Sequence, residues 1–293
     1  MLIKESLENQ EAMSSVEKQL SDYFLNDTSE IKELTARQLA NDLYVSPSTV
    51  TRFCQRLGFS GFPEFKEALI KERLYLAHNV QDIDVNQPFL PSDSIWSVAN
   101  NIRQLYTEVV ADTLSLQDYQ QLESATKKLS DAQHIYVYSA GDHRHLAEIF
   151  ANKMLRIGRP ITQLSRTDLV DFYLQESVAN DVVVLISYSG ETQDIHRLMT
   201  IMDNRKLQVI ALTAYGKNTL SEHADILLPM STRERLIQNF GNFSTDVSVS
   251  YLLDILYASY LSRHVEANET KMQIEKEYQR YRFTENPIIK DQS

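Results

Sequence analysis

The sequence is poor in cysteine, glycine and proline, and it lacks any long apolar run. Its one cysteine, Cys54, excludes a disulfide framework and a cysteine-rich metal site. The longest strong apolar run, Val182 to Ile186, has five residues, whereas a membrane-spanning helix needs ~18. The polar N-terminus does not have the pattern of a signal peptide. We therefore expect a protein that has no contact with a membrane and works in the cytoplasm.

Acidic residues outnumber basic ones, and the formal net charge of the 293 residues is −11. A wholly acidic chain is a poor non-specific binder of nucleic acid. The charge is unevenly distributed, because the segment from Val45 to Pro63 contains Arg52 and Arg56 and no acidic residue. DNA binding by one local surface therefore stays open, and this segment is where that surface is expected.

The hydrophobic pattern divides the chain into parts. Residues 1–78 have apolar residues at spacings of three and four, which predicts an all-α domain. Residues 79–94 hold two of the prolines and have no periodicity, as is typical of a linker. From 95 to 270, helical stretches alternate with short apolar runs. This predicts an α/β domain with a five-stranded parallel sheet flanked by helices, in flavodoxin-like layering. Residues 271–293 form a charged C-terminal tail.

Start and stop signals in the first part predict two short helices joined by a tight turn. Thr35 and Gln38 have capping-box spacing, so a helix is predicted to start at Thr35. Ser46 followed by Pro47 is a second start signal, and Gly58 is the expected C-cap. A buried stripe at i, i+3, i+4 and i+7 lies between them: Val50, Phe53, Cys54 and Leu57. This is helix-turn-helix geometry, and Cys54 is expected to be a small core residue, with a redox sensor as the alternative.

The start and the opposite face of the second helix are polar and are the candidate DNA-binding surface. The residues are Ser46, Ser48, Thr49, Thr51, Arg52, Gln55 and Arg56. Such a face can enter a major groove, where arginines pair with guanine or with phosphates. The same spacing also fits a helical hairpin that packs against another protein, so geometry alone leaves both interpretations open.

The residues from Ala40 onward resemble the N-terminal domain of RpiR/MurR-type transcriptional regulators. The resemblance rests on Ala40 to Val50, on RFCQRLGF from Arg52 to Phe59, and on GFPEFK from Gly61 to Lys66. It implies a transcriptional regulator whose N-terminal domain binds a double-stranded DNA operator. Tyr44 stands where the family often has glycine in the turn. A bulky residue there would bend the turn or make a contact of its own.

Two of the predicted strands end in loops with glycine and small hydroxyl groups. One runs from Ser139 through Gly141 to His143, and the other from Ser187 to Thr192. In open α/β sheets this edge is where ligands bind, and glycine together with a helix N-terminus favours an anion such as phosphate. The alternative is that the hydroxyl groups only cap the helices that follow.

The second loop, SYSGET, resembles the S-x-S-G-x-T loop of the sugar isomerase (SIS) domain. The resemblance implies a SIS-like fold in which Ser187, Ser189 and Thr192 bind the phosphate of a phosphosugar, next to Gly190 and Glu191. In the first loop, the family's first glycine is replaced by Ser139 and its usual serine by His143. An imidazole can still face a phosphate, so Ser139, Gly141 and His143 are included in the candidate ligand site.

Isomerisation of a sugar phosphate needs a general base, and we find no carboxylate–histidine pair at informative spacing. His143 and His145 form an H-x-H without an evident third ligand, so no metal, no cofactor and no catalytic residue is expected. We predict a transcriptional regulator of sugar or amino-sugar metabolism genes, whose DNA affinity changes when the SIS-like domain binds a phosphorylated sugar without turnover. A homodimer or homotetramer is expected, because SIS-like domains generally dimerise and two reading domains match a palindromic operator. The alternatives are a phosphosugar isomerase with a helical appendage and a protein-interaction adaptor.

Overall fold

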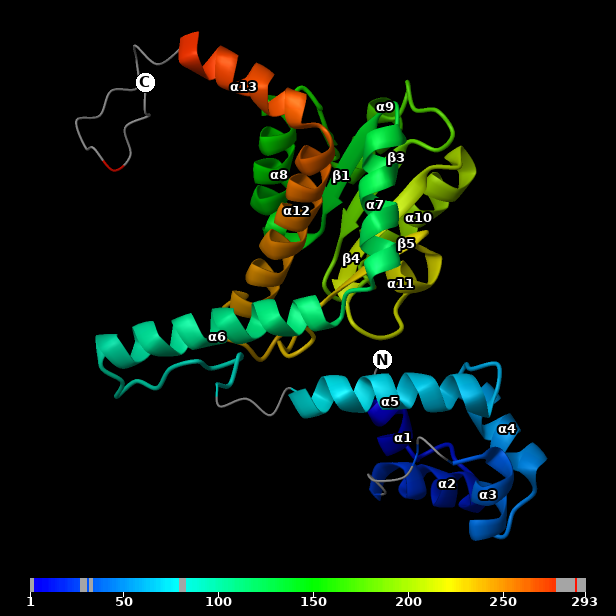
Figure 1. Ribbon diagram of the computed structural model, residues 1–293. Coiled ribbons are helices and arrows are strands. Elements are labelled where there is room, and N and C mark those ends of the chain that lie inside the picture. The colour runs from blue at the N-terminus through cyan, green and yellow to red at the C-terminus, as the bar shows by residue number, and fades with distance from the viewer. Residues whose placement is uncertain (1–2, 27–30, 32–33, 79–82, 278–287, 289–293) are drawn as a thin grey trace. The chain divides into compact units, whose positions relative to one another are not determined.

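The computed structural model describes residues 3–26, 31, 34–78, 83–277 and 288 (Figure 1). These residues gather into two compact units. The first comprises Met1–Leu116 together with Tyr215–Asn218 and Ser231–Gly241, and the second holds the rest of the chain. The charged tail predicted at 271–293 lies mostly outside the described residues.

The first unit is built from helices, as the sequence predicts for residues 1–78. They are α1 (Ile3–Glu8), α2 (Ser15–Asn26), α3 (Ala36–Asp42), α4 (Pro47–Arg56), α5 (Phe62–His78) and α6 (Ile95–Ser115). The predicted start signals form as expected. Thr35 Oγ1 accepts from the backbone N–H of Gln38 at 3.2 Å, and Gln38 Oε1 accepts from the Thr35 N–H at 2.9 Å. Ser46 caps α4 by accepting from the Thr49 N–H at 3.1 Å, and Pro47 is the first residue of that helix.

A phenylalanine-rich core holds the helices of the helix-turn-helix region together. Phe24 lies at its centre, with ring centroids 4.9 Å from Phe65 and 6.3 Å from Phe53. The stripe predicted on α4 faces this core, since Val50, Phe53 and Cys54 are buried. Burial raises the pKa of the Cys54 thiol to about 12, so the cysteine is a protonated core residue.

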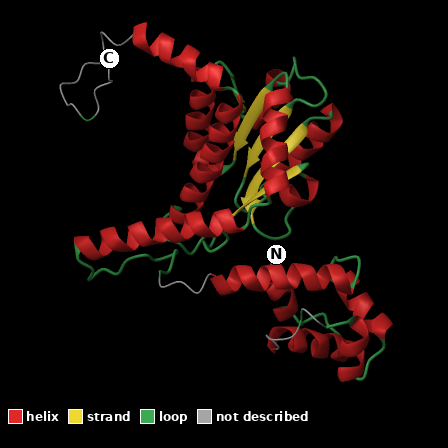
Figure 2. Cartoon of the chain, in the orientation of Figure 1, coloured by secondary structure: helices red, strands yellow, loops and turns green. Residues whose placement is uncertain are grey.

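The second unit is an α/β fold whose sheet has five parallel strands in the order β2-β1-β3-β4-β5. Figure 2 shows the strands in yellow with red helices around them. The five apolar runs of the sequence supply these strands. They are β1 (Ile135–Ser139), β2 (Thr162–Gln163), β3 (Val182–Ile186), β4 (Gln208–Ala214) and β5 (Ile226–Met230). This strand order is flavodoxin-like, and the predicted fold class is confirmed.

Helices cover both faces of this sheet because its central strands are apolar on both sides. Val184 and Ile186 face one core, whereas Val183 and Leu185 face the other. The first core is closed by α7 (Tyr119–Asp131), α8 (Arg144–Arg156) and α12 (Phe243–Arg263). The second is closed by α9 (Val170–Tyr173), α10 (Gln193–Arg205) and α11 (Thr219–His223). Short 3-10 turns η1 (Gly141–His143) and η2 (Thr167–Leu169) precede α8 and α9, and α13 (Val265–Glu277) follows α12.

The stretch predicted as a linker is ordered where the structure describes it. Val85 is buried, Asn86 accepts a hydrogen bond from the Phe240 N–H at 2.9 Å, and the rings of Phe89 and Phe240 lie 5.8 Å apart. Helix α6, which the sequence analysis assigned to the α/β domain, belongs to the first compact unit. The predicted domain boundaries stay a prediction.

Candidate DNA-binding and ligand-binding sites

The candidate DNA-binding residues lie on one helix and its cap, but their side chains are in different situations. Ser46, Ser48 and Thr49 form a cluster of hydroxyl groups at the start of α4, with Oγ–Oγ distances of 2.7 Å and 2.8 Å from Ser46. Thr51 donates back to the Pro47 carbonyl at 3.2 Å, so its hydroxyl serves its own helix. Gln55 is exposed and reaches the Ser60 carbonyl at 3.5 Å.

The two arginines of α4 differ in whether their side chains already have hydrogen-bond partners within the protein. Arg52 is exposed and makes no hydrogen bond or ion pair with any residue that the structure describes. Arg56 instead holds Glu17 of α2, with Nη1 2.7 Å from both carboxylate oxygens, and Nη2 donates to the Ala12 carbonyl at 2.6 Å. The backbone N–H and hydroxyl of Ser14, together with Arg56, lower the pKa of Glu17 from 4.5 to about 2. Arg52 is therefore the arginine available to an incoming partner, while Arg56 ties α4 to α2.

The two candidate ligand loops lie side by side at the carboxyl ends of β1 and β3. At this point the order in which strands are added to the sheet reverses. Strands β1 and β3 are neighbours, with Ser139 opposite Ile186, and the Ala140 N–H donates to the Ile186 carbonyl at 2.9 Å. The chain leaves β1 into α8 on one face and leaves β3 into α10 on the other. This is the topological switch point where open α/β sheets bind ligands.

Two buried hydroxyl groups at this point have no hydrogen-bond partner among the described residues. They are Ser139 Oγ, at the end of β1, and Thr192 Oγ1, directly before α10. Thr192 is the N-cap residue of α10, yet its side chain accepts no N–H of that helix. The alternative in which the hydroxyl groups only cap the helix is therefore wrong for Thr192. A buried hydroxyl without a partner costs ~1–3 kcal/mol, which a polar ligand would recover.

Hydrogen bonds within the second loop stabilise the conformation of its other residues. Ser187 Oγ accepts from the Gly190 N–H, and Ser189 Oγ accepts from the Glu191 N–H, each at 3.3 Å. Gly190 has a φ of +66°, a conformation that a residue with a side chain rarely adopts. In the first loop Gly141 has a φ of +67°, and a Cβ there would meet nothing within 4 Å.

His143 is paired with a residue that the sequence analysis did not find. The imidazole is buried in η1, and its Nδ1 lies 2.7 Å from Asp246 Oδ1 in the first turn of α12. Because 103 positions separate the two residues, their spacing in the sequence does not indicate the pair, and only the fold brings them together. The contact with the carboxylate fixes the orientation of the imidazole ring.

The carboxylate of Glu191 is hydrogen-bonded within the protein and connects its loop to the start of α11. Its carboxylate accepts from the Thr219 N–H at 2.6 Å and from the Thr219 hydroxyl at 2.8 Å. The backbone hydrogen bond from Thr219 is the main cause that lowers the pKa of Glu191. Two backbone contacts join the same segments, since Ala214 N–H donates to the Tyr188 carbonyl at 3.0 Å and Leu220 N–H to the Gly190 carbonyl at 3.2 Å.

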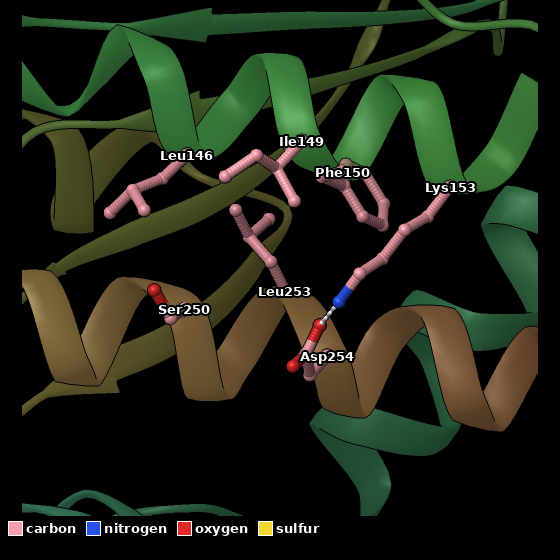
Figure 3. Close-up of a pocket in the computed structure, with 7 residues that line it drawn as sticks. All are labelled: Leu146, Ile149, Phe150, Lys153, Ser250, Leu253 and Asp254. Carbon is pink, nitrogen blue, oxygen red and sulfur yellow. Dashed lines mark hydrogen bonds and ion pairs between the residues drawn. The ribbon is translucent and has the colours of Figure 1, made fainter. Parts of the chain in front are cut away.

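A separate, mostly apolar groove lies between α8 and α12 (Figure 3). Lys153 and Asp254 form an ion pair across one end of it. The other lining residues are Leu146, Ile149, Phe150, Ser250 and Leu253. This lining offers few donors to a phosphate, which distinguishes the groove from the two loops.

The described part of the chain contains neither a candidate metal centre nor a candidate membrane segment. No group of three or more His, Cys, Asp or Glu residues lies close enough there to hold a metal ion. No helix in those ranges has the length and hydropathy required to span a membrane.

The chain combines a helix-turn-helix unit with a flavodoxin-like domain whose switch-point loops are suited to an anion. This combination is typical of ligand-responsive DNA-binding proteins. The family model of the rpiR-family helix-turn-helix domain matches residues 1–74, and that of the SIS domain matches residues 128–258. An uncharacterized HTH-type transcriptional regulator of Haemophilus influenzae is 26% identical over 85% of this chain and 85% of its own length. The chain is an RpiR-type helix-turn-helix transcriptional regulator with a SIS domain.

Solved structures share this fold. The Vibrio vulnificus NanR protein complexed with ManNAc-6P has a TM-score of 0.58 and 22% identity, over 93% of this chain and 96% of its own. The sugar isomerase domain of an RpiR transcription factor from Sphaerobacter thermophilus has a TM-score of 0.52 and 18% identity, over 62% of this chain and 98% of its own.

Proposed function

We propose that this regulator binds a phosphorylated sugar at the switch point of its sheet and that the bound sugar changes its affinity for an operator. The observation that carries the proposal is the pair of buried, unpartnered hydroxyl groups of Ser139 and Thr192. They flank a loop that already positions Ser187, Ser189 and Gly190 near the N-terminus of α10, where an anion is favoured. The complex of the Vibrio vulnificus NanR protein with ManNAc-6P supports the choice of ligand class.

His143 and Gly141 complete the proposed site from the first loop. His143, oriented by Asp246, supplies an imidazole where the SIS family usually has a serine. Gly141 leaves open space beside it.

For DNA, we propose Arg52 as the main reading residue of α4. Ser46, Ser48 and Thr49 offer hydroxyl groups at the helix start, where phosphates are commonly bound. Gln55, Thr51 and Arg56 stay candidates on the same helix, although Arg56 has to exchange Glu17 for DNA. Because a protein that binds chromosomal operators works where the DNA is, we propose a cytoplasmic location.

The connection between Glu191 and Thr219 suggests how the two events are coupled. Thr219 directly follows Tyr215–Asn218, a segment of the first compact unit, although Glu191 belongs to the second. A ligand that shifts the 187–192 loop would therefore also displace Thr219, whose backbone continues directly into Tyr215–Asn218 of the first unit. Coupling of this kind is typically ~1–3 kcal/mol, or ~5–150-fold in affinity.

We further propose a homodimer or homotetramer in which residues 79–94 link the DNA-binding and ligand-binding domains. Ile149, which lines the groove between α8 and α12, is 49% exposed, and a second copy of this chain would cover it. Size-exclusion chromatography with light scattering measures the oligomeric state. A monomer at micromolar concentration would contradict this part of the proposal.

The experiment for the ligand is calorimetric titration of the full chain with hexose, pentose and N-acetylhexosamine phosphates and with the same sugars without phosphate. Binding of a phosphorylated sugar alone, reduced by Thr192→Val, is expected. Affinity for the unphosphorylated sugar equal to that for its phosphate would refute a phosphate site.

The second candidate function, a sugar-phosphate isomerase, is favoured by one observation, the His143–Asp246 pair, which resembles an oriented general base. We propose that the domain binds without turnover, because the curated relatives that match most of the chain are named as transcriptional regulators. Incubation with the tightest sugar phosphate and analysis by NMR tests this. Interconversion that is lost in His143→Ala would establish the enzyme instead.

A further inference from the structure

The turn of the helix-turn-helix contains a strained residue that a glycine would replace without strain. After α3, the Val45 N–H donates to the Ala40 carbonyl at 2.8 Å, and the Tyr44 N–H donates to the Asn41 carbonyl at 3.2 Å. This is a Schellman motif, which places one residue in the left-handed conformation, usually glycine. After α4 that residue is Gly58, with a φ of +87°, but after α3 it is Tyr44, with a φ of +55°.

The side chain of Tyr44 contributes nothing to the fold that would offset this strain. It is 96% exposed, and its hydroxyl makes no hydrogen bond with any residue that the structure describes. Lys206 occupies the equivalent position after α10, with a φ of +56°. A lysine there has an electrostatic reason, because its charge favours the carbonyl end of a helix, whereas a neutral tyrosine has none. An external partner is the remaining physical explanation for a large aromatic residue at this point.

The position of Tyr44 indicates which partner this is. It lies two residues before Ser46, the cap of α4, next to the acid-free segment that carries Arg52. When a recognition helix enters a major groove, its first residues reach base edges and the adjoining backbone meets phosphates. Tyrosine hydroxyls are common donors to those phosphates. We propose that Tyr44 donates its hydroxyl to a backbone phosphate at the rim of the groove. This inference depends on the proposed DNA-binding face of α4.

The test uses the full chain and an operator duplex selected from a randomised pool, with binding followed by fluorescence anisotropy. Tyr44→Phe removes only the hydroxyl and should lower the affinity about tenfold. Because a phosphate contact carries no sequence information, the loss should be equal for the selected duplex and a shuffled one. Because tyrosine is neutral, the dependence of affinity on salt should not change in Tyr44→Phe. Arg52→Ala, by contrast, should reduce the discrimination between the selected and the shuffled duplex.

Tyr44→Gly separates the DNA contact from the fold. It should lose at least as much affinity as Tyr44→Phe, while the thermal midpoint stays the same or rises by about 2 °C as the strain is relieved. Lys206→Gly is the matched control, since it relieves the same strain outside the helix-turn-helix and should leave DNA affinity unchanged. Equal binding of wild type and Tyr44→Phe would overturn the inference alone. Failure of the wild type to bind any duplex would overturn the proposed DNA-binding face with it.

Discussion

Arg52 and Arg56 lie one turn apart on α4, and replacing each with alanine should have opposite consequences. Arg56→Ala should destabilise the helix-turn-helix unit, because it removes the contacts to Glu17 and to the Ala12 carbonyl. Arg52→Ala should leave stability unchanged, because its side chain has no partner in the described chain. It should instead weaken DNA binding.

The size of each effect follows from the surroundings. Glu17 is 19% exposed and Arg56 47% exposed, so solvent screens their attraction, and an exposed pair contributes only ~0.2–1 kcal/mol. The added hydrogen bond to a carbonyl and the multiple contacts raise the expected loss of unfolding free energy to ~1–2 kcal/mol. For Arg52→Ala the change in stability should stay within ~0.5 kcal/mol, while the binding free energy falls by ~1–3 kcal/mol.

Urea denaturation and anisotropy with a selected duplex measure the two quantities on the same preparations. Glu17→Gln is the matched control, because it weakens the same ion pair without touching α4, and it should reproduce part of the stability loss. The reasoning is refuted if Arg52→Ala destabilises the unit as much as Arg56→Ala does, or if Arg56→Ala leaves the urea midpoint unchanged.

Three further outcomes are expected. The pKa of Glu17 is lowered from 4.5 to about 2, so its contribution to stability is complete above about pH 4.5 and is lost as the pH falls toward 2. In acid denaturation, Glu17→Gln should not show the loss of stability that the wild type shows over this pH range. Thr192→Val should weaken sugar-phosphate binding about tenfold in calorimetry without lowering the thermal midpoint, because its hydroxyl has no partner in the described chain; a lower midpoint would argue against a ligand role. Glu191→Gln should keep sugar-phosphate affinity within a few-fold but reduce the effect of that ligand on DNA affinity, and an unchanged coupling factor would place the connection elsewhere.

Much of the fold could be predicted because it depends on local chemistry. The capping box at Thr35, the cap at Ser46 and the apolar run of β3 are each written within a few neighbouring residues. Unbroken apolar strands predict burial on both faces, and the structure places them so. The switch-point loops follow from the same reasoning, because ligand loops lie at the carboxyl ends of parallel strands.

Other features could not be predicted, because they depend on pairs that are distant in sequence. Nothing near His143 indicates that Asp246 will face it from another helix. Arg52 and Arg56 look alike in the sequence, and only the approach of α2 engages one of them. The position of Glu191 in the sequence groups it with the phosphate loop, but in the structure its carboxylate accepts hydrogen bonds from Thr219. In each case the fold decides which partner a polar group meets.

The buried state of Cys54 has a practical consequence for spectroscopy. Its thiol is fully inaccessible, and with a pKa of about 12 it is almost entirely protonated at neutral pH, so maleimide dyes should not react with it in the folded protein. Cysteines introduced on the surface would then be the only reactive thiols of the folded protein. With one such cysteine in each compact unit, a donor and an acceptor fluorophore could be attached without removing Cys54, and the response to a sugar phosphate could be followed as a change in energy transfer.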